Sequence, residues 1–97
     1  MNIIKRKTLI DFCVKHPASE SALESWFAEA KKSEWRGPAD IKARYGSADI
    51  IAGNRVIFNI CGNNYRLVVK IAYKAKIVYI RFIGTHAEYG KINAEEV

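Results

Sequence analysis

The sequence predicts an α+β domain in which N-terminal helices pack on one face of a mainly antiparallel, twisted sheet of four to five strands. In the first half of the chain, hydrophobic residues recur at the spacing of an amphipathic helix. In the second half they alternate from one residue to the next, as in strands with one buried face. Helices first and a meander of strands second is the pattern of an α+β fold.

The first elements are expected to be a short strand at Asn2–Ile4 and a helix after it. Thr8 followed by Asp11 resembles the start of this helix. Pro17 ends it, because the residue before a proline is pushed out of the α region.

The second helix is expected to open at Ser19 or Ser21, and Ser21 with Glu24 fits a capping box. Four apolar residues then recur at helical spacing and are assigned to the core: Leu23, Trp26, Phe27 and Ala30. A third, short helix is expected at Pro38–Tyr45, since proline suits a first helical position. Gly46 would end it in a left-handed conformation.

The second half is expected to form strands at Asp49–Ala52, Arg55–Ile60, Tyr65–Tyr73 and Ile77–Ile83. The connections at Gly53-Asn54 and Cys61–Asn64 contain residues that tolerate positive φ. The last strand is apolar on both faces, which favours a central place in the sheet.

A face of the sheet away from the helices would be free to meet a partner. Arg66 and Lys70 lie two pleats apart and point the same way from their strand. Arg81 is expected to join them on this open face if Ile80 and Phe82 pack under the helices.

The bulk properties are those of one globular domain, residues 1–97, of which 49% are hydrophobic. No apolar run approaches the length of a membrane span, and the N-terminus does not resemble a signal peptide. Two cysteines form no recognisable disulfide framework, so we expect a cytoplasmic protein. Sixteen basic residues against ten acidic ones give a net charge of +6, which favours a nucleic-acid partner.

Metal and cofactor signals are weak, and we expect neither a metal nor a cofactor. Cys13 and His16 have a tolerable ligand spacing but no second pair to complete a tetrahedral site. We expect Cys13 to be buried and His16 to lie at a helix C-terminus.

The groups able to do chemistry lie near the end of the last strand and just after it: Arg81, His86 and Tyr89. RNA carries its own nucleophile, the 2′-hydroxyl, so its cleavage needs a base, an acid and cations on the phosphate. Histidine exchanges protons near neutrality, arginine grips two phosphate oxygens, and tyrosine stacks on a base or donates a proton. The plainer alternatives are a solvated histidine, arginines paired with carboxylates, and a tyrosine that caps the core.

Three stretches carry a resemblance to a known family: WRGPADIKARYG, VIFNICGNNYRLVVKIAY and VYIRFIGTHAEY. Over nearly its whole length the chain resembles the HigB-type toxins of bacterial type II toxin–antitoxin systems, within the RelE-like ribonuclease superfamily. The resemblance implies a RelE-like fold and a metal-independent endonuclease that cleaves mRNA in the decoding site of the ribosome. It also implies a small helix-turn-helix antitoxin of the HigA type, whose complex with the toxin represses its own promoter DNA.

Carried over by position, the resemblance implies that Arg66 and Arg81 contact phosphate. It makes His86 the acid/base candidate and Tyr89 the residue that stacks on a base or handles a proton. The expected RNA-binding residues are Lys70, Lys91 and Asn63.

The chain departs from the family pattern at Gly90, where relatives commonly carry aspartate after the tyrosine. If that carboxylate orients His86 or the attacking hydroxyl, Gly90 predicts an attenuated toxin. A non-catalytic, basic RNA-binding module is the other alternative; mutations would weaken its affinity gradually instead of abolishing cleavage.

Overall fold

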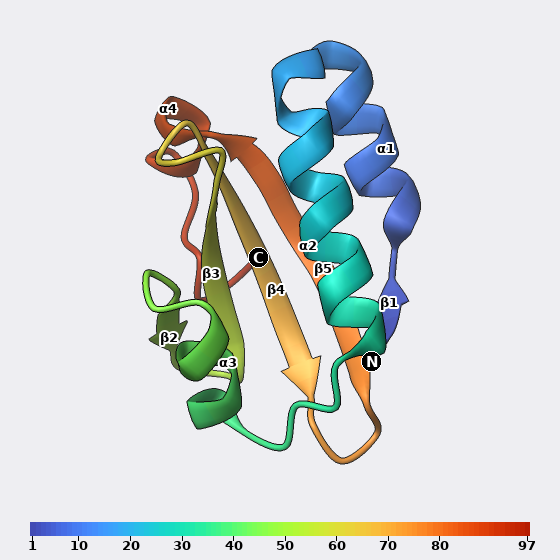
Figure 1. Ribbon diagram of the computed structural model, residues 1–97. Helices are drawn as coiled ribbons and strands as arrows, with labels where there is room; N and C mark the ends of the chain where they lie inside the picture. Colours follow the sequence, from blue (N-terminus) through green and yellow to red (C-terminus); the bar gives the residue numbers. More distant parts are fainter.

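The computed structural model describes all residues, 1–97, as a helical layer on one face of a five-stranded sheet (Figure 1). The helices are α1 (Arg6–Lys15), α2 (Glu20–Lys32), α3 (Pro38–Arg44) and α4 (His86–Tyr89), with a 3₁₀ turn at Pro17–Ser19. The strands are β1 (Asn2–Ile4), β2 (Asp49–Ile51), β3 (Arg55–Ile60), β4 (Tyr65–Ala72) and β5 (Ile77–Thr85).

The sheet order is β1-β5-β4-β3-β2, and only the β1–β5 pair is parallel. The predicted α+β fold is therefore confirmed, and β5 lies between two strands as its apolar faces indicated. Both glycine-containing turns have the expected positive φ, at Gly53 and Asn54 and again at Cys61 and Gly62. None of the helices combines the length and the apolar character needed to cross a membrane.

The predicted start of α1 is wrong, whereas Ser19, one of the two predicted starts of α2, is its N-cap residue. α1 begins at Arg6, two residues before Thr8, and no side chain caps it. α2 begins at Glu20 directly after the 3₁₀ turn, so no capping box forms at Ser21. The Ser19 hydroxyl donates to the His16 carbonyl at 2.7 Å, and its side chain is buried instead of capping α2.

The expected left-handed stop after α3 is also wrong, because Gly46 is not among the residues with positive φ. The Tyr45 N–H donates to the Ile41 carbonyl at 2.7 Å and closes the last turn. The Lys42 ammonium then donates to the carbonyls of Gly46 and Ala48, both at 2.8 Å. These two bonds hold the chain in the turn that leads to β2.

The hydrophobic core lies between α1, α2 and the sheet. Alternation predicts one buried face for β3 and one for β4, and the apolar aliphatic and phenylalanine residues of these faces lie in the core: Val56, Phe58, Ile60, Leu67, Val69 and Ile71. Tyr65 and Tyr73, predicted on the same face, are partly buried and pack against it. The Phe58 ring packs edge-on against Trp26 of α2 at 5.4 Å between ring centres. Burial of each such large side chain contributes roughly 1.5–3 kcal/mol. Phe27, which was also assigned to the core, lies at the rim of this cluster and is half-buried. The guanidinium carbon of Arg6 lies 4.5 Å from the centre of its ring and covers it.

A β-bulge in β5 determines where its side chains point. Val68 pairs with Phe82 and Val69 pairs with Ile80, which leaves Arg81 as the extra residue. The expectation that Ile80 and Phe82 both pack under the helices is therefore wrong. Ile80 packs against the core, whereas Phe82 faces the other side of the sheet.

Arg81 still lies on the face of the sheet away from the helices, which we call the far face. The reason is the bulge, and not the simple alternation that was expected. Its guanidinium carbon is 5.5 Å from the centre of the Tyr79 ring, and Tyr79 pairs with Lys70 across the two strands. Lys70 and Arg66 alternate with the core residues of β4, so both point away from the helices.

The far face is not fully open, contrary to expectation. Ile57 and Val68 point away from the helices yet are only 3% and 0% exposed, respectively. The chain after α4 runs back toward β3 (Figure 1), where Arg55 donates two hydrogen bonds to the main-chain oxygen of Val97, at 3.2 and 2.8 Å. We refer to residues 90–97 as the C-terminal segment.

Candidate active site

The short helix α4 is fixed at its start by a reciprocal capping box. The Glu88 N–H donates to the Thr85 hydroxyl at 3.2 Å, and the Thr85 N–H donates to the Glu88 carboxylate at 2.8 Å. Hydrogen bonding to the Glu88 carboxylate, first from the Thr85 backbone N–H and then from the Thr85 side chain, lowers the pKa of Glu88 below its ordinary value. The His86 N–H donates to the Asn64 carbonyl at 3.3 Å and ties α4 to the β3–β4 turn. The capped turn thus fixes the backbone that carries His86 and Tyr89.

Gly84 allows α4 to lie close to the sheet. A Cβ atom at this position would be 2.5 Å from Phe82 Cζ and 3.2 Å from Glu88 Cβ. The centre of the Phe82 ring is 6.5 Å from that of Tyr89. A side chain at Gly84 would therefore displace the aromatic ring that packs beside Tyr89.

Arg66 is the cation that the structure places directly at Tyr89. Its guanidinium carbon lies 4.8 Å from the centre of the Tyr89 ring, within the range of a cation–π contact. Arg66 pairs with Gly84 across β4 and β5, under α4. Its Nε atom is buried and has no hydrogen-bond partner. Because a buried guanidinium N–H without a partner is costly, this group is suited to an incoming acceptor such as a phosphate oxygen.

Neither Arg66 nor Arg81 has a carboxylate partner. The ion pairs of the chain lie elsewhere: Lys32 and Arg44 with Glu29, and Lys76 with Glu34. The alternative that these strand arginines exist to pair with carboxylates is therefore wrong. Two guanidinium groups on the far face keep their full charge for an anionic ligand.

The predicted site residues fall into two groups along the far face. Arg66, His86 and Tyr89 lie at the α4 end, and Asn63 is exposed in the adjoining turn. Arg81 precedes Gly84 by three residues, about 10 Å along the strand.

The two predicted lysines lie apart from each other. Lys70 lies beyond Arg81, opposite Tyr79. Lys91 is exposed just after α4, where its N–H donates to the Glu88 carbonyl at 3.1 Å. The structure thus brings Arg66 into contact with Tyr89 and places His86 on the same short helix as Tyr89, with Lys91 directly after that helix and Lys70 further along the sheet.

Sequence reasoning missed α4 and the residues that hold it. Thr85-x-x-Glu88 has the pattern of a capping box, so the signal was present in the chain. The role of Phe82 was hidden, because nothing in the sequence marks the bulge that turns it toward Tyr89.

The end of α1 lies beside the same site. His16 is the C-cap of α1, as expected, and its ring stacks on Phe12 at 4.4 Å and lies 5.6 Å from that of Tyr65. The positive charges of His16 and Lys15 add a smaller lowering of the pKa of Glu88. Cys13, expected to be buried, is half-buried, and its Sγ lies 3.8 Å from the Ser19 hydroxyl oxygen.

Gly90 does not need to be glycine for conformational reasons. Its φ of −63° and ψ of −15° are helical, and an added Cβ would lie at an ordinary 3.5 Å from the Ala87 carbonyl oxygen. An aspartate at this position would fit the backbone as it stands.

The N-terminal helices on a five-stranded sheet are the architecture expected of a RelE-like toxin. Residues 19–92 match the family model of HigB toxins, described as the RelE-like toxic component of a toxin–antitoxin system. The match covers most of the chain, and the chain belongs to this family, as its sequence motifs indicated.

Individual relatives agree with this assignment over nearly the full length. The mRNA interferase toxin HigB of Escherichia coli (strain K12) is 30% identical over 91 residues, which cover 92% of this chain and 88% of that protein. An mRNA interferase HigB of Shigella flexneri has the same identity and coverage. One from Escherichia coli O6:H1 (strain CFT073) is 24% identical over 94 residues, or 95% of this chain and 91% of that protein.

Proposed function

We propose that this toxin is an endoribonuclease, an mRNA interferase that cuts messenger RNA on the ribosome and so inhibits translation. The observation that carries the proposal is the Arg66 guanidinium held against Tyr89, without a carboxylate partner, beside the capped turn that bears His86. The names of the HigB relatives and the net charge of +6 support it.

The reaction uses the 2′-hydroxyl of the RNA itself. The 2′-oxygen loses its proton to a base and forms a bond to phosphorus, while the bond from phosphorus to the 5′-oxygen breaks. The departing 5′-oxygen takes up a proton, so the products are a 2′,3′-cyclic phosphate and a 5′-hydroxyl. No metal ion or cofactor enters this scheme.

His86 is the proposed proton carrier of this reaction, since an imidazole gains and loses protons near neutral pH. Arg66 binds the scissile phosphate as negative charge builds on it, and Tyr89 holds that guanidinium and contacts the neighbouring nucleotide. Arg81, further along β5, holds the same or the adjoining phosphate.

The RNA path continues on both sides of these groups. Lys70 and Lys91 supply backbone contacts, and Asn63 offers an amide in the exposed β3–β4 turn. Such contacts position the strand without reading its sequence.

We expect cleavage to depend on the ribosome, because the chain offers few catalytic side chains. Correct placement of reacting groups contributes about 7–11 kcal/mol in favourable cases, and a ribosome that holds the mRNA supplies placement that a small domain lacks. We therefore expect weak or absent cleavage of naked RNA.

A cognate antitoxin neutralises the toxin, and we propose that it is a helix-turn-helix protein of the HigA type whose complex with the toxin binds promoter DNA. This chain has no helix-turn-helix of its own among α1–α4, so it needs the antitoxin to reach DNA.

Inducible expression followed by primer extension on translated messages tests the proposal. Wild type should stop growth and leave discrete new 5′ ends, and His86→Ala or Arg81→Ala should abolish both while the protein still folds. Arg36→Ala is the control, because this exposed arginine lies between α2 and α3 and outside the candidate site. Growth arrest without new 5′ ends would leave a non-catalytic RNA-binding module as the better description.

A further inference from the structure

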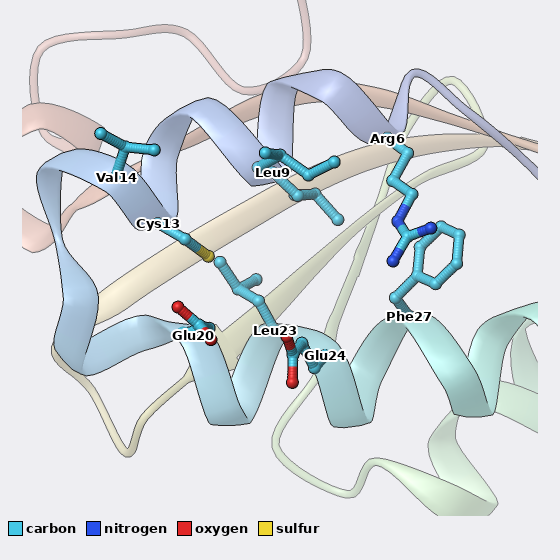
Figure 2. A pocket seen from close by; sticks show the side chains of 9 residues that line it. Arg6, Leu9, Cys13, Val14, Glu20, Leu23, Glu24 and Phe27 are labelled. Atoms are coloured by element: carbon cyan, nitrogen blue, oxygen red, sulfur yellow. The ribbon is translucent and has the colours of Figure 1, made fainter.

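A second feature lies on the other side of the molecule, on the outer surface of the helical layer. A groove of about 290 Å³ runs between α1 and α2 (Figure 2). Leu9 and Cys13 of α1 and Leu23 of α2 lie between the two helices and form its floor. At one end, the Arg6 guanidinium lies over the Phe27 ring. The candidate active site does not use any of these residues.

The α1 side of this groove, which we call the α1–α2 groove, is unusually apolar for a solvent-facing surface. Val14 is 77% exposed and Ile10 is 51% exposed, the two highest values among the large hydrophobic residues. They are four residues apart, so they lie on one face of α1 together with Arg6, four residues earlier. Three turns of helix thus present a cation, an isoleucine and a valine in a row.

The α2 side of the groove carries the opposite charge. Glu20 and Glu24 are also one turn apart, are exposed, and have no ion-pair partner. They form an acidic edge on a protein whose net charge is +6. An RNA backbone would be repelled here, so this surface serves a different partner from the one proposed for the far face.

We propose that the α1–α2 groove binds an amphipathic helix of the cognate antitoxin. The helix would present an apolar stripe to Ile10 and Val14, with lysine or arginine along the edge that meets Glu20 and Glu24. An acidic residue at one end of the helix would meet Arg6. This inference rests on the proposed function only in taking the antitoxin as the partner.

The net charge of the chain favours the antitoxin over a second copy of this chain as the occupant of the α1–α2 groove. Two copies would each bring a net charge of +6, which opposes self-association. A helix laid into a hydrophobic groove is a recurrent mode of recognition, read through anchors at i, i+3 and i+4. Such anchors would lie on the antitoxin helix, and Ile10 and Val14 of the toxin, one turn apart, would contact them.

The test measures binding of the antitoxin encoded beside this gene to purified toxin variants by titration calorimetry. The double variant Ile10→Asn and Val14→Asn should weaken binding at least about thirtyfold, as expected for central apolar anchors. Ile50→Asn is the matched control, since Ile50 is 38% exposed on the edge strand β2. Glu24→Lys should weaken binding about fivefold to tenfold, and less at high salt.

The two free cysteines allow an independent measurement on the unmodified complex. Cys13 lies in the groove, whereas Cys61 lies in the exposed β3–β4 turn, where its thiol donates to the Ala18 carbonyl at 3.8 Å. Bound antitoxin should slow alkylation of Cys13 and leave Cys61 reactive. Protection of Cys61 alone would place the antitoxin at the β3–β4 turn, outside the groove, and overturn the inference.

Failure of the inference and failure of the proposed function give different results. If the groove variants bind antitoxin as tightly as wild type, the groove proposal is wrong, whereas the nuclease proposal is untouched. If wild-type toxin binds no antitoxin at all, both the proposed antitoxin and its docking site are refuted. In either case the groove variants should cut mRNA as wild type does when antitoxin is absent.

Discussion

Replacing Arg66 separates catalysis from stability, because its contacts in the folded protein are few. Its guanidinium carbon is 4.8 Å from the Tyr89 ring centre, and its Nε has no hydrogen-bond partner. A cation–π contact of this kind contributes about 0.5–1 kcal/mol. Arg66→Ala should therefore lower the melting temperature by no more than about 8 °C for a domain of this size.

The effect on cleavage should be much larger than the effect on stability. Loss of one preorganised group at a developing charge costs about 10²–10³ in rate, or roughly 2.7–4 kcal/mol. Arg66→Lys keeps the charge but loses the planar, two-pronged grip, so its activity should fall between wild type and Arg66→Ala. Single-turnover cleavage of ribosome-bound mRNA and thermal denaturation give the two quantities.

Arg44 provides the matched control for this experiment. Arg44 lies in α3, and its guanidinium carbon is 5.3 Å from the centre of the Tyr45 ring, as Arg66 lies over Tyr89. Unlike Arg66, it also donates a hydrogen bond to the Glu29 carboxylate at 2.9 Å. Arg44→Ala should lose similar stability and keep full activity. Cleavage by Arg66→Ala within about threefold of wild type would refute the role given to Arg66.

Four further predictions concern α4 and the residues next to it. Thr85→Ala removes the side-chain cap and should cost about 0.5–2 kcal/mol of stability and reduce cleavage, as thermal denaturation and kinetics will show. Because hydrogen bonds from Thr85 lower the pKa of Glu88 in the folded state, the stability they add is present above pH 4.5 and is lost as pH falls through the folded value. Amide protection in α4, measured relative to the intrinsic exchange rate at each pH, should fall there, whereas that in α2 should not. Gly84→Ala puts a Cβ at 2.5 Å from the Phe82 ring and should destabilise by about 1–3 kcal/mol, whereas unchanged stability would mean the ring moves freely. Gly90→Asp should increase growth arrest if Gly90 attenuates the toxin, and equal toxicity of the two forms would remove that idea.

Much of the fold could be predicted because its signals are local. Alternation in β3 and β4 placed the core face of the sheet correctly, and the glycine- and asparagine-containing turns set the strand ends. The bulge could not be predicted, since Arg81 is flanked by apolar residues that suit either face. Its effect is that Phe82, assigned to the core, packs beside Tyr89 instead.

The surroundings of the site depend on contacts between distant parts of the chain, and periodicity does not report those. The bond from Arg55 to Val97 and the burial of Ile57 reveal that the C-terminal segment returns to the sheet. A four-residue helix such as α4 is too short for a hydrophobic period, although the threonine and glutamate of its cap were visible. That Arg66 has no carboxylate partner, and so can bind a phosphate, could be known only from the ion pairs of the folded chain.

The central claim is that the toxin cuts RNA through the 2′-hydroxyl beside the scissile phosphate. The direct measurement uses a ribosome-bound mRNA in which only the nucleotide 5′ of a mapped cut carries a 2′-deoxyribose. The account predicts that cleavage at that position disappears, cuts elsewhere persist, and the all-ribose message yields 5′-hydroxyl ends. Continued cutting at the deoxy position would contradict it.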